Sequence, residues 1–327
     1  ATFVIGGIGP ITGGAAIYGQ CVKDSAEIAV AEINAAGGIN GVMIEYTFED
    51  DENNAEKGVN AYNSLKDWGM QALMGTTTTT PCIAVAEKSA EDGMFEITPS
   101  ASSEEVIEND NVFQVCFTDP NQGSASATYI AENELAKKVA VIYDSSTVYS
   151  SGIYESFVQG AKEQNFEIVA AEAFTNDSAT DFSVQIQKVK DSGADLLFLP
   201  IYYEAAALIL DQANSAGLDV KYFGCDGLDG VIGQLGDKAA LAEGVMLLTP
   251  FSADAEDELT KNFVAKYNEL YGETPNQFAA DAYDGIYIMK AALEQCGATA
   301  DMDASAICDL VKVAMTEITV DGLTGAG

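Results

Sequence analysis

The sequence of 327 residues contains no histidine and no arginine, so all fifteen of its basic residues are lysines. These absences exclude a Ser-His-Asp triad, a Cys-His nucleophile pair, an imidazole metal site and an arginine clamp on phosphate or carboxylate. Any chemistry must therefore rest on hydroxyls, carboxylates, lysines and backbone groups. No metal site and no cofactor is expected.

Long hydrophobic runs are also missing. No stretch reaches the roughly 18 apolar residues that a membrane span needs, and residues 2–5 already resemble a strand, so we expect neither a membrane helix nor an intact signal peptide. Six cysteines lie far apart without a C-x-x-C pair, which argues against a zinc ribbon or redox motif. A bridge between Cys296 and Cys308 fits the spacing, but buried free thiols are the favoured interpretation.

Positive charge is scarce. Fifteen Lys+Arg against 51 Asp+Glu give a net charge of −36, while 48% of the residues are hydrophobic. This combination indicates a folded acidic protein that repels phosphates, so nucleic acid is excluded as a partner. At roughly 100 to 200 residues per domain, the length predicts two domains.

Short β-branched runs alternate with segments of helical periodicity, which predicts α/β lobes with parallel sheets. The pattern occurs twice, so we expect two similar lobes. Helices at 255–271 and 276–295, with no strand between them, are expected to pack on the first lobe. Strands are predicted at 2–8, 42–48, 71–74, 94–98, 139–143, 167–173, 196–199, 221–224 and 246–251, and the other helices at 19–36, 51–65, 81–91, 123–135, 151–164, 182–190 and 204–216.

The glycine-rich run at 6–14 resembles a dinucleotide loop only superficially. Its spacing is wrong, Pro10 lacks the backbone donor that a phosphate would need, and the next strand-end acids come too late in the sequence. A glycine-rich turn is the better interpretation. The acidic run at 50–54 lacks the alternating ligands of a calcium loop and is interpreted as a solvated helix start capped by Asp51.

Ligands of open parallel sheets bind beyond the carboxyl ends of the strands. One such end carries five threonines, with Thr80 expected as the N-cap and Pro81 as the first helical residue. The next has a capping-box pattern in Ser102-x-x-Glu105. Two hydroxyl-rich helix starts at neighbouring strand ends would suit one small carboxylate.

The second lobe supplies the opposite chemistry. Asp226 follows one predicted strand, Tyr202 follows another, and Tyr149 lies in a loop after a third. A carboxylate with two tyrosines would suit a primary ammonium attached to an apolar body. Because no Gly-x-Ser-x-Gly elbow and no distinct carboxylate pair occur, a carboxylate-based hydrolase is the weaker alternative.

Along its length the chain resembles the Leu/Ile/Val-binding family of type I periplasmic solute-binding proteins, which serve branched-chain amino acid ABC transporters. The most specific match is Ile-Asn-Ala-x-Gly-Gly-Ile-x-Gly at 33–41. Other matching stretches are Gly9-Pro-Ile-Thr-Gly13, Ile97-Thr-Pro-Ser-Ala-Ser102, Thr118-Asp-Pro-Asn-Gln-Gly123, Asp181-Phe-Ser183 and Ala282-Tyr-Asp284.

The resemblance implies two Rossmann-like lobes joined by three crossovers, with hinge closure around the ligand. The first lobe would comprise residues 1–119 and 251–321 and the second residues 120–250, with 322–327 starting a tail that returns to the second lobe. It also implies a non-enzymatic, monomeric protein that delivers its ligand to an ABC permease. The location would be extracytoplasmic, either in the periplasm or lipid-anchored at the outer face of the membrane.

Transferred by position, the resemblance assigns the ligand carboxylate to Thr79 and Ser102 and the ammonium to Asp226, Ser102 and the Ser100 carbonyl. Thr77 and Thr78 stand where an apolar wall is common, and a family disulfide is absent because Thr78 and Asn53 occupy its positions. The complete predicted ligand-binding set is Tyr18, Thr77, Thr78, Thr79, Ser100, Ala101, Ser102, Tyr149, Tyr202, Asp226 and Phe278.

These residues lead us to expect a neutral amino acid with a branched-chain, other aliphatic or aromatic side chain. An acidic side chain would need a second cation, and no lysine lies at the assigned strand ends. The alternative within binding proteins is the ligand-sensing ectodomain of a receptor, which uses the same fold.

Overall fold

The computed structural model describes all residues from 1 to 327. By its internal contacts the chain forms two units, one of Ala1–Phe117 with Pro250–Gly327 and one of Thr118–Thr249. Residues 322–327 are grouped with the first of these units.

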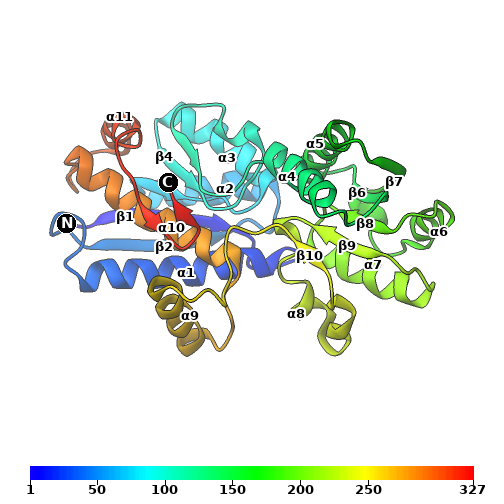
Figure 1. Cartoon of the computed structure of the whole chain (residues 1–327). Helices are drawn as coiled ribbons and strands as arrows, with labels where there is room; N and C mark the ends of the chain where they lie inside the picture. The colour runs from blue at the N-terminus through cyan, green and yellow to red at the C-terminus, as the bar shows by residue number, and fades with distance from the viewer. The chain divides into compact units, whose positions relative to one another are not determined.

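The first unit is built on a five-stranded parallel sheet in the order β2-β1-β3-β4-β5. Helices α1 and α10 cover one face and α2 and α3 the other (Figure 1). Because both faces are covered, β3 is apolar and buried throughout. The elements are β1 (Phe3–Gly9), α1 (Ala16–Ala35), β2 (Ile44–Asp50), α2 (Ala55–Trp68), β3 (Ala72–Met74), α3 (Thr79–Asp92), β4 (Phe95–Thr98), β5 (Val112–Gln114), α9 (Glu258–Tyr271), α10 (Gln277–Cys296) and α11 (Ala304–Ala314).

The second unit repeats the plan with the order β10-β9-β8-β6-β7, again parallel. Its core joins Phe157, Phe198 and Phe223, and the first two rings stack with centroids 3.8 Å apart. The elements are α4 (Asp119–Glu132), β6 (Lys138–Asp144), α5 (Val148–Gln164), β7 (Glu167–Phe174), α6 (Ser183–Asp191), β8 (Leu196–Leu199), α7 (Tyr203–Ser215), β9 (Lys221–Gly224), α8 (Val231–Leu235) and β10 (Met246–Leu247).

The predicted α/β class with two parallel-sheet lobes is confirmed. Helices α9 and α10 both pack against α1. Several short elements were not predicted from the sequence, namely β5, α8, α11 and the hairpin of β11 (Asp321–Gly322) with β12 (Gly325–Ala326). All six cysteines are free, including Cys296 and Cys308.

The β11–β12 hairpin is attached to the first unit by Asp284 of α10. The carboxylate accepts hydrogen bonds from the N–H groups of Leu323 and Thr324, at 2.8 and 2.9 Å, and from the Thr324 hydroxyl at 2.6 Å. A Cβ at Gly322 would lie 2.5 Å from this carboxylate, so the close approach requires glycine. The Asp284 contact therefore fixes the hairpin to the helix.

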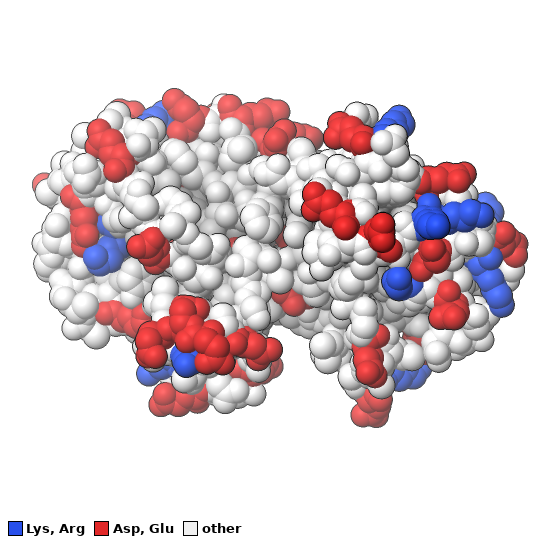
Figure 2. Space-filling view, in the orientation of Figure 1, with Lys and Arg blue, Asp and Glu red and all other residues white.

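Acidic side chains gather over α9 and the loop before it (Figure 2). Asp254, Glu256 and Glu269 line one shallow depression there, and Lys261 contacts Glu256 at 3.0 Å. The acids on this surface outnumber the two lysines of α9, Lys261 and Lys266, so the surface is strongly negative. None of the helices combines the length and apolar character needed to cross a bilayer.

Candidate functional site

The carboxyl ends of β3 and β4 hold the threonine run of the first unit in place. Thr98 donates a 2.7 Å hydrogen bond to the carbonyl of Thr76, and Ser100 donates one of 2.6 Å to the carbonyl of Thr77. The Thr77 hydroxyl is itself bonded to the carbonyl of Ile8 at 3.1 Å. Ser100 and Thr77 thus use their hydroxyls to shape the loop.

Helix α3 begins at Thr79, directly after this loop. Its N-cap is Thr78, so the predictions of Thr80 as cap and Pro81 as first helical residue are wrong by two positions. The Thr78 hydroxyl donates to Asn53 Oδ1 at 2.7 Å instead of capping the helix. The buried Thr79 hydroxyl has no hydrogen-bond partner. An uncapped helix N-terminus beside a buried unpaired hydroxyl can accept an anion.

The end of β4 differs from the predicted second helix start. The cap is Ser103, not Ser102, and it accepts from the N–H of Glu105 at 3.2 Å before the short 3₁₀ helix Glu104–Ile107. The expected capping box is therefore wrong, because neighbouring serines offer equal caps in the sequence. Ser102 is fully buried, and the adjacent Ala101 donates its N–H to Thr98 Oγ1 at 3.0 Å.

Tyr18 and Phe278 form an aromatic pair in the first unit. Tyr18 belongs to α1 and Phe278 to the first turn of α10, and their rings stack with centroids 4.3 Å apart. Both side chains are buried. The structure thus brings together two predicted site residues that lie 260 positions apart.

In the second unit, Tyr149, Tyr202 and Asp226 lie together beyond the ends of β6, β8 and β9. The Tyr149 hydroxyl donates a 2.6 Å hydrogen bond to Asp226 Oδ1 and accepts one of 3.0 Å from the N–H of Gly227. The Tyr202 ring packs on Tyr149 with centroids 4.6 Å apart. Parallel strands place all three residues at one edge of the sheet, as predicted.

Burial raises the pKa of Asp226 to about 6, although the hydrogen bond from Tyr149 favours the charged form. Gln122 of α4 also accepts from the N–H of Asp226 at 3.0 Å, and its own Nε2 is buried without a partner. Gln122 lies in one of the stretches that carry the family resemblance, but nothing in the sequence assigned it to the site. Asp226 is a costly buried carboxylate that a cation would stabilise.

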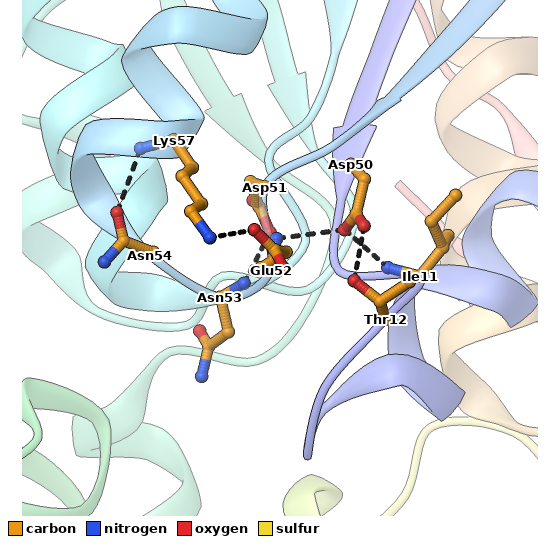
Figure 3. Close-up of polar contacts among 8 residues, drawn as sticks. All are labelled: Ile11, Thr12, Asp50, Asp51, Glu52, Asn53, Asn54 and Lys57. Carbon is orange, nitrogen blue, oxygen red and sulfur yellow. Dashed lines mark hydrogen bonds and ion pairs between the residues drawn. The ribbon is translucent and has the colours of Figure 1, made fainter.

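The acidic run after β2 is not the solvated helix start that was predicted (Figure 3). Asp51 is fully buried, and burial raises its pKa to about 7. Asp50 accepts from the N–H of Ile11 at 2.9 Å and from the Thr12 hydroxyl at 2.6 Å, and hydrogen bonds lower its pKa. The cap of α2 is Asn54 rather than Asp51, because Asp51 accepts from the N–H of Asn53 instead.

No group of three or more acidic or cysteine side chains is arranged to hold a metal ion.

The glycines of the run at 6–14 have a packing role. A Cβ at Gly6 would lie 2.5 Å from Met70 Sδ, and at Gly9 it would collide with Thr77 Oγ1. These glycines allow β1 to pack closely against its neighbours.

Comparison with known proteins identifies the family to which the chain belongs. A family model described as periplasmic binding protein matches residues 2–327, and the chain belongs to this family. Its relatives are Leu/Ile/Val-binding proteins of the branched-chain amino acid group, with the type I fold. The members are solute-binding proteins rather than enzymes, and the family name denotes an extracytoplasmic location.

Three comparisons illustrate the similarity. The chain is 31% identical to Leu/Ile/Val-binding protein homolog 3 of Brucella melitensis over 94% of this chain and 82% of the relative. The branched-chain amino acid transporter substrate-binding protein LivJ of Streptococcus pneumoniae, solved with isoleucine, is 30% identical with a TM-score of 0.89 over 99% of this chain and 91% of that one. A solute-binding protein from R. palustris, solved with benzoate, shares the fold at 20% identity and a TM-score of 0.87, covering 100% of this chain and 88% of that one.

Proposed function

We propose that this chain binds a free neutral amino acid, with the carboxylate at the N-terminus of α3 and the ammonium at Asp226, and that the two lobes close around it. The ligand would then be passed to the permease of an ABC transporter by a monomeric protein. Lipid anchoring at the outer face of the membrane and free residence in the periplasm are both consistent with this role. The names of the relatives support the ligand class.

The observation that carries the proposal is chemical complementarity between the half-sites. The first unit offers donors without a formal charge, namely the start of α3 and the unpaired Thr79 hydroxyl, together with buried Ser102. The second offers a buried carboxylate held by Tyr149. An α-amino acid zwitterion carries the two matching charges on adjacent groups, so it could satisfy both half-sites at once.

The side chain of the ligand is proposed to be aliphatic or aromatic. Tyr18, Phe278, Tyr149 and Tyr202 supply apolar area, and no lysine lies among the assigned residues to neutralise an acidic side chain. Ala101, Thr77 and Thr78 are proposed to complete the wall, with the Ser100 carbonyl as an acceptor for the ammonium.

A second candidate ligand is an aromatic carboxylate such as benzoate, which the R. palustris protein binds. The buried Asp226 argues against it, because benzoate has no ammonium to pair with that carboxylate. A receptor ectodomain would bind the same ligands, and its gene would encode a membrane span attached to this fold.

A thermal-shift screen of the twenty amino acids together with benzoate tests the proposal, because a ligand of the native state raises the melting temperature by mass action. We expect leucine, isoleucine, valine or phenylalanine to give the largest shift. A response to benzoate but to no amino acid would disprove the assignment, as would glutamate or arginine binding at least about tenfold tighter than every neutral amino acid.

A further inference from the structure

The start of α3 lacks the side-chain cap that its sequence could provide. Thr78 occupies the N-cap position with extended backbone angles, where a threonine hydroxyl normally accepts a hydrogen bond from the N–H two or three residues later. The third helical residue is Pro81, which has no N–H. The N–H of Thr80 is therefore the single donor that the Thr78 hydroxyl could cap.

The Thr78 hydroxyl is directed elsewhere. It donates a 2.7 Å hydrogen bond to Asn53 Oδ1, in the loop between β2 and α2. Asn53 has a left-handed backbone with a φ of 56°, and its N–H is held by Asp51 Oδ1 at 2.9 Å. The acceptor for Thr78 is thus fixed by the structure of its own loop.

We propose that Asn53 is a positioning residue for ligand binding, which holds the Thr78 hydroxyl away from the helix and leaves the N–H of Thr80 available to the ligand carboxylate. The inference rests on the proposed function. Two independent observations support it, because the helix has no side-chain cap and the buried Thr79 hydroxyl beside it has no protein partner. In this proposal the N-terminus of α3 keeps a backbone N–H that no side chain caps, and an anion can accept its hydrogen bond.

The test is a double-mutant series measured by calorimetry with leucine and isoleucine. In Asn53→Ala the Thr78 hydroxyl is released, caps Thr80 and competes with the ligand, so affinity should fall about fivefold, the equivalent of one helix cap of about 1 kcal/mol. Adding Thr78→Val removes the competing hydroxyl and keeps the volume of the proposed wall, so the double variant should bind more tightly than Asn53→Ala. A hydrogen bond that merely braces the loop predicts no such recovery.

Stability provides a second readout. Alanine is strained at the left-handed φ of Asn53, so the stability readout uses Asn53→Gly, which tolerates this backbone. Because the freed hydroxyl caps α3, Asn53→Gly should keep or raise the melting temperature of the ligand-free protein while it weakens binding. Asn54→Ala is the matched control, since Asn54 caps α2 by accepting from the N–H of Lys57 at 2.9 Å. This control should lower the melting temperature and leave affinity within about twofold.

The outcomes separate the two proposals. Recovery of affinity in the double variant supports the role of Asn53. A double variant that binds as weakly as Asn53→Ala, or a lower melting temperature in Asn53→Gly, overturns it while amino acid binding by the parent protein stands. A parent protein that binds neither amino acid overturns both.

Discussion

Tyr149 fixes both ends of the turn that follows β9, because its hydroxyl donates to Asp226 Oδ1 at 2.6 Å and accepts from the N–H of Gly227 at 3.0 Å. One phenol thereby orients a buried carboxylate without adding a positive charge. A Cβ at Gly227 would lie 2.7 Å from the Tyr149 hydroxyl, so the turn also depends on glycine. The arrangement leaves the charge of Asp226 to be neutralised by a ligand.

Replacing Asp226 with alanine should nearly abolish amino acid binding. The ligand ammonium would be buried without a partner, at a cost of roughly 3 to 5 kcal/mol, or at least about a hundredfold in affinity. Isothermal calorimetry with the best ligand of the screen measures the effect, and Asp219→Ala, on the surface of the same unit, serves as control. An Asp226→Ala protein with affinity within threefold of the parent would contradict the assigned role.

Amino acid affinity should fall as the pH is lowered through about 6, the pKa to which burial raises Asp226. A cationic ligand group requires the ionised carboxylate, so below that pKa binding must displace a proton and affinity drops about tenfold per pH unit. Calorimetry from pH 4.5 to 7.5 measures this slope. Asp226→Asn should bind weakly with a flat profile, and an equally steep slope in that variant would show that another group is responsible.

In the ligand-free protein, the ionisation of Asp226 should have the opposite effect: the free energy of unfolding should fall, whereas ligand affinity rises, as the pH increases. A carboxyl whose pKa rises from 3.8 to about 6 on folding stabilises the fold fully below 3.8, and this contribution is lost as the pH rises through 6. Unfolding in denaturant between pH 3.5 and 7, compared for the parent and Asp226→Asn, checks the prediction. The stability of the parent relative to the variant should decline across this window. An increase would mean that folding lowers the pKa of Asp226 instead of raising it.

Glu96 should weaken the fold progressively as the pH rises from 4.5 to 8. This fully buried carboxyl of β4 has one oxygen without a partner, and burial raises its pKa to about 8. Ionisation is therefore favoured in the unfolded chain. On going from below pH 4.5 to pH 7, the free energy of unfolding of Glu96→Gln should rise by roughly 3 kcal/mol relative to that of the parent. Denaturant unfolding of both proteins at several pH values is the measurement. A pH-independent difference between them would show that Glu96 does not titrate in this range.

Gly9→Ala should destabilise the first unit by about 1 to 3 kcal/mol, because the added methyl would overlap Thr77 Oγ1 and lie 2.9 Å from Thr77 Cβ. Gly233→Ala is the control, since a Cβ there meets nothing within 4 Å and alanine favours the helix α8. Melting temperatures of the two variants should move in opposite directions. Equal stability would mean that the Thr77 loop yields to the methyl group.

Salt should stabilise this protein against heat. The net charge of −36 and the acidic surface over α9 (Figure 2) create repulsion that the compact state concentrates. Raising KCl from 0.01 to 0.15 M shortens the screening length from about 30 to about 8 Å, so the melting temperature should rise. A melting temperature that falls with KCl would mean that attractive ion pairs outweigh the repulsion.

The sequence predicted the long helices well. Helices that cover the faces of a parallel sheet bury one side, and this burial appears in the sequence as apolar residues at helical spacing. The α1 and α10 helices are examples, each with a continuous buried side. It did not predict β5, whose three residues form the edge of the sheet. Short elements depend on contacts with distant segments, which a local pattern does not contain.

Helix caps were predicted less accurately for a related reason. Asp51, Thr80 and Ser102 each have an equally suitable polar neighbour, and tertiary hydrogen bonds decide between them. Asn53 shows this most clearly, because it engages both Asp51 and Thr78. The strand ends that carry the candidate site were predicted, whereas the hydrogen bonds of Asn53 to Thr78 and of Gln122 to Asp226 became visible only in three dimensions.

Three of the buried carboxyls have a practical consequence in a chain without histidine. Asp226, Asp51 and Glu96 have pKa values of about 6, 7 and 8, a range in which imidazoles dominate the titration of most proteins. Carbon-detected NMR of labelled aspartate and glutamate could therefore follow each one against a nearly silent background. Proton release on adding ligand, measured calorimetrically in buffers of different ionisation enthalpy, would then count the protons that leave a single aspartate.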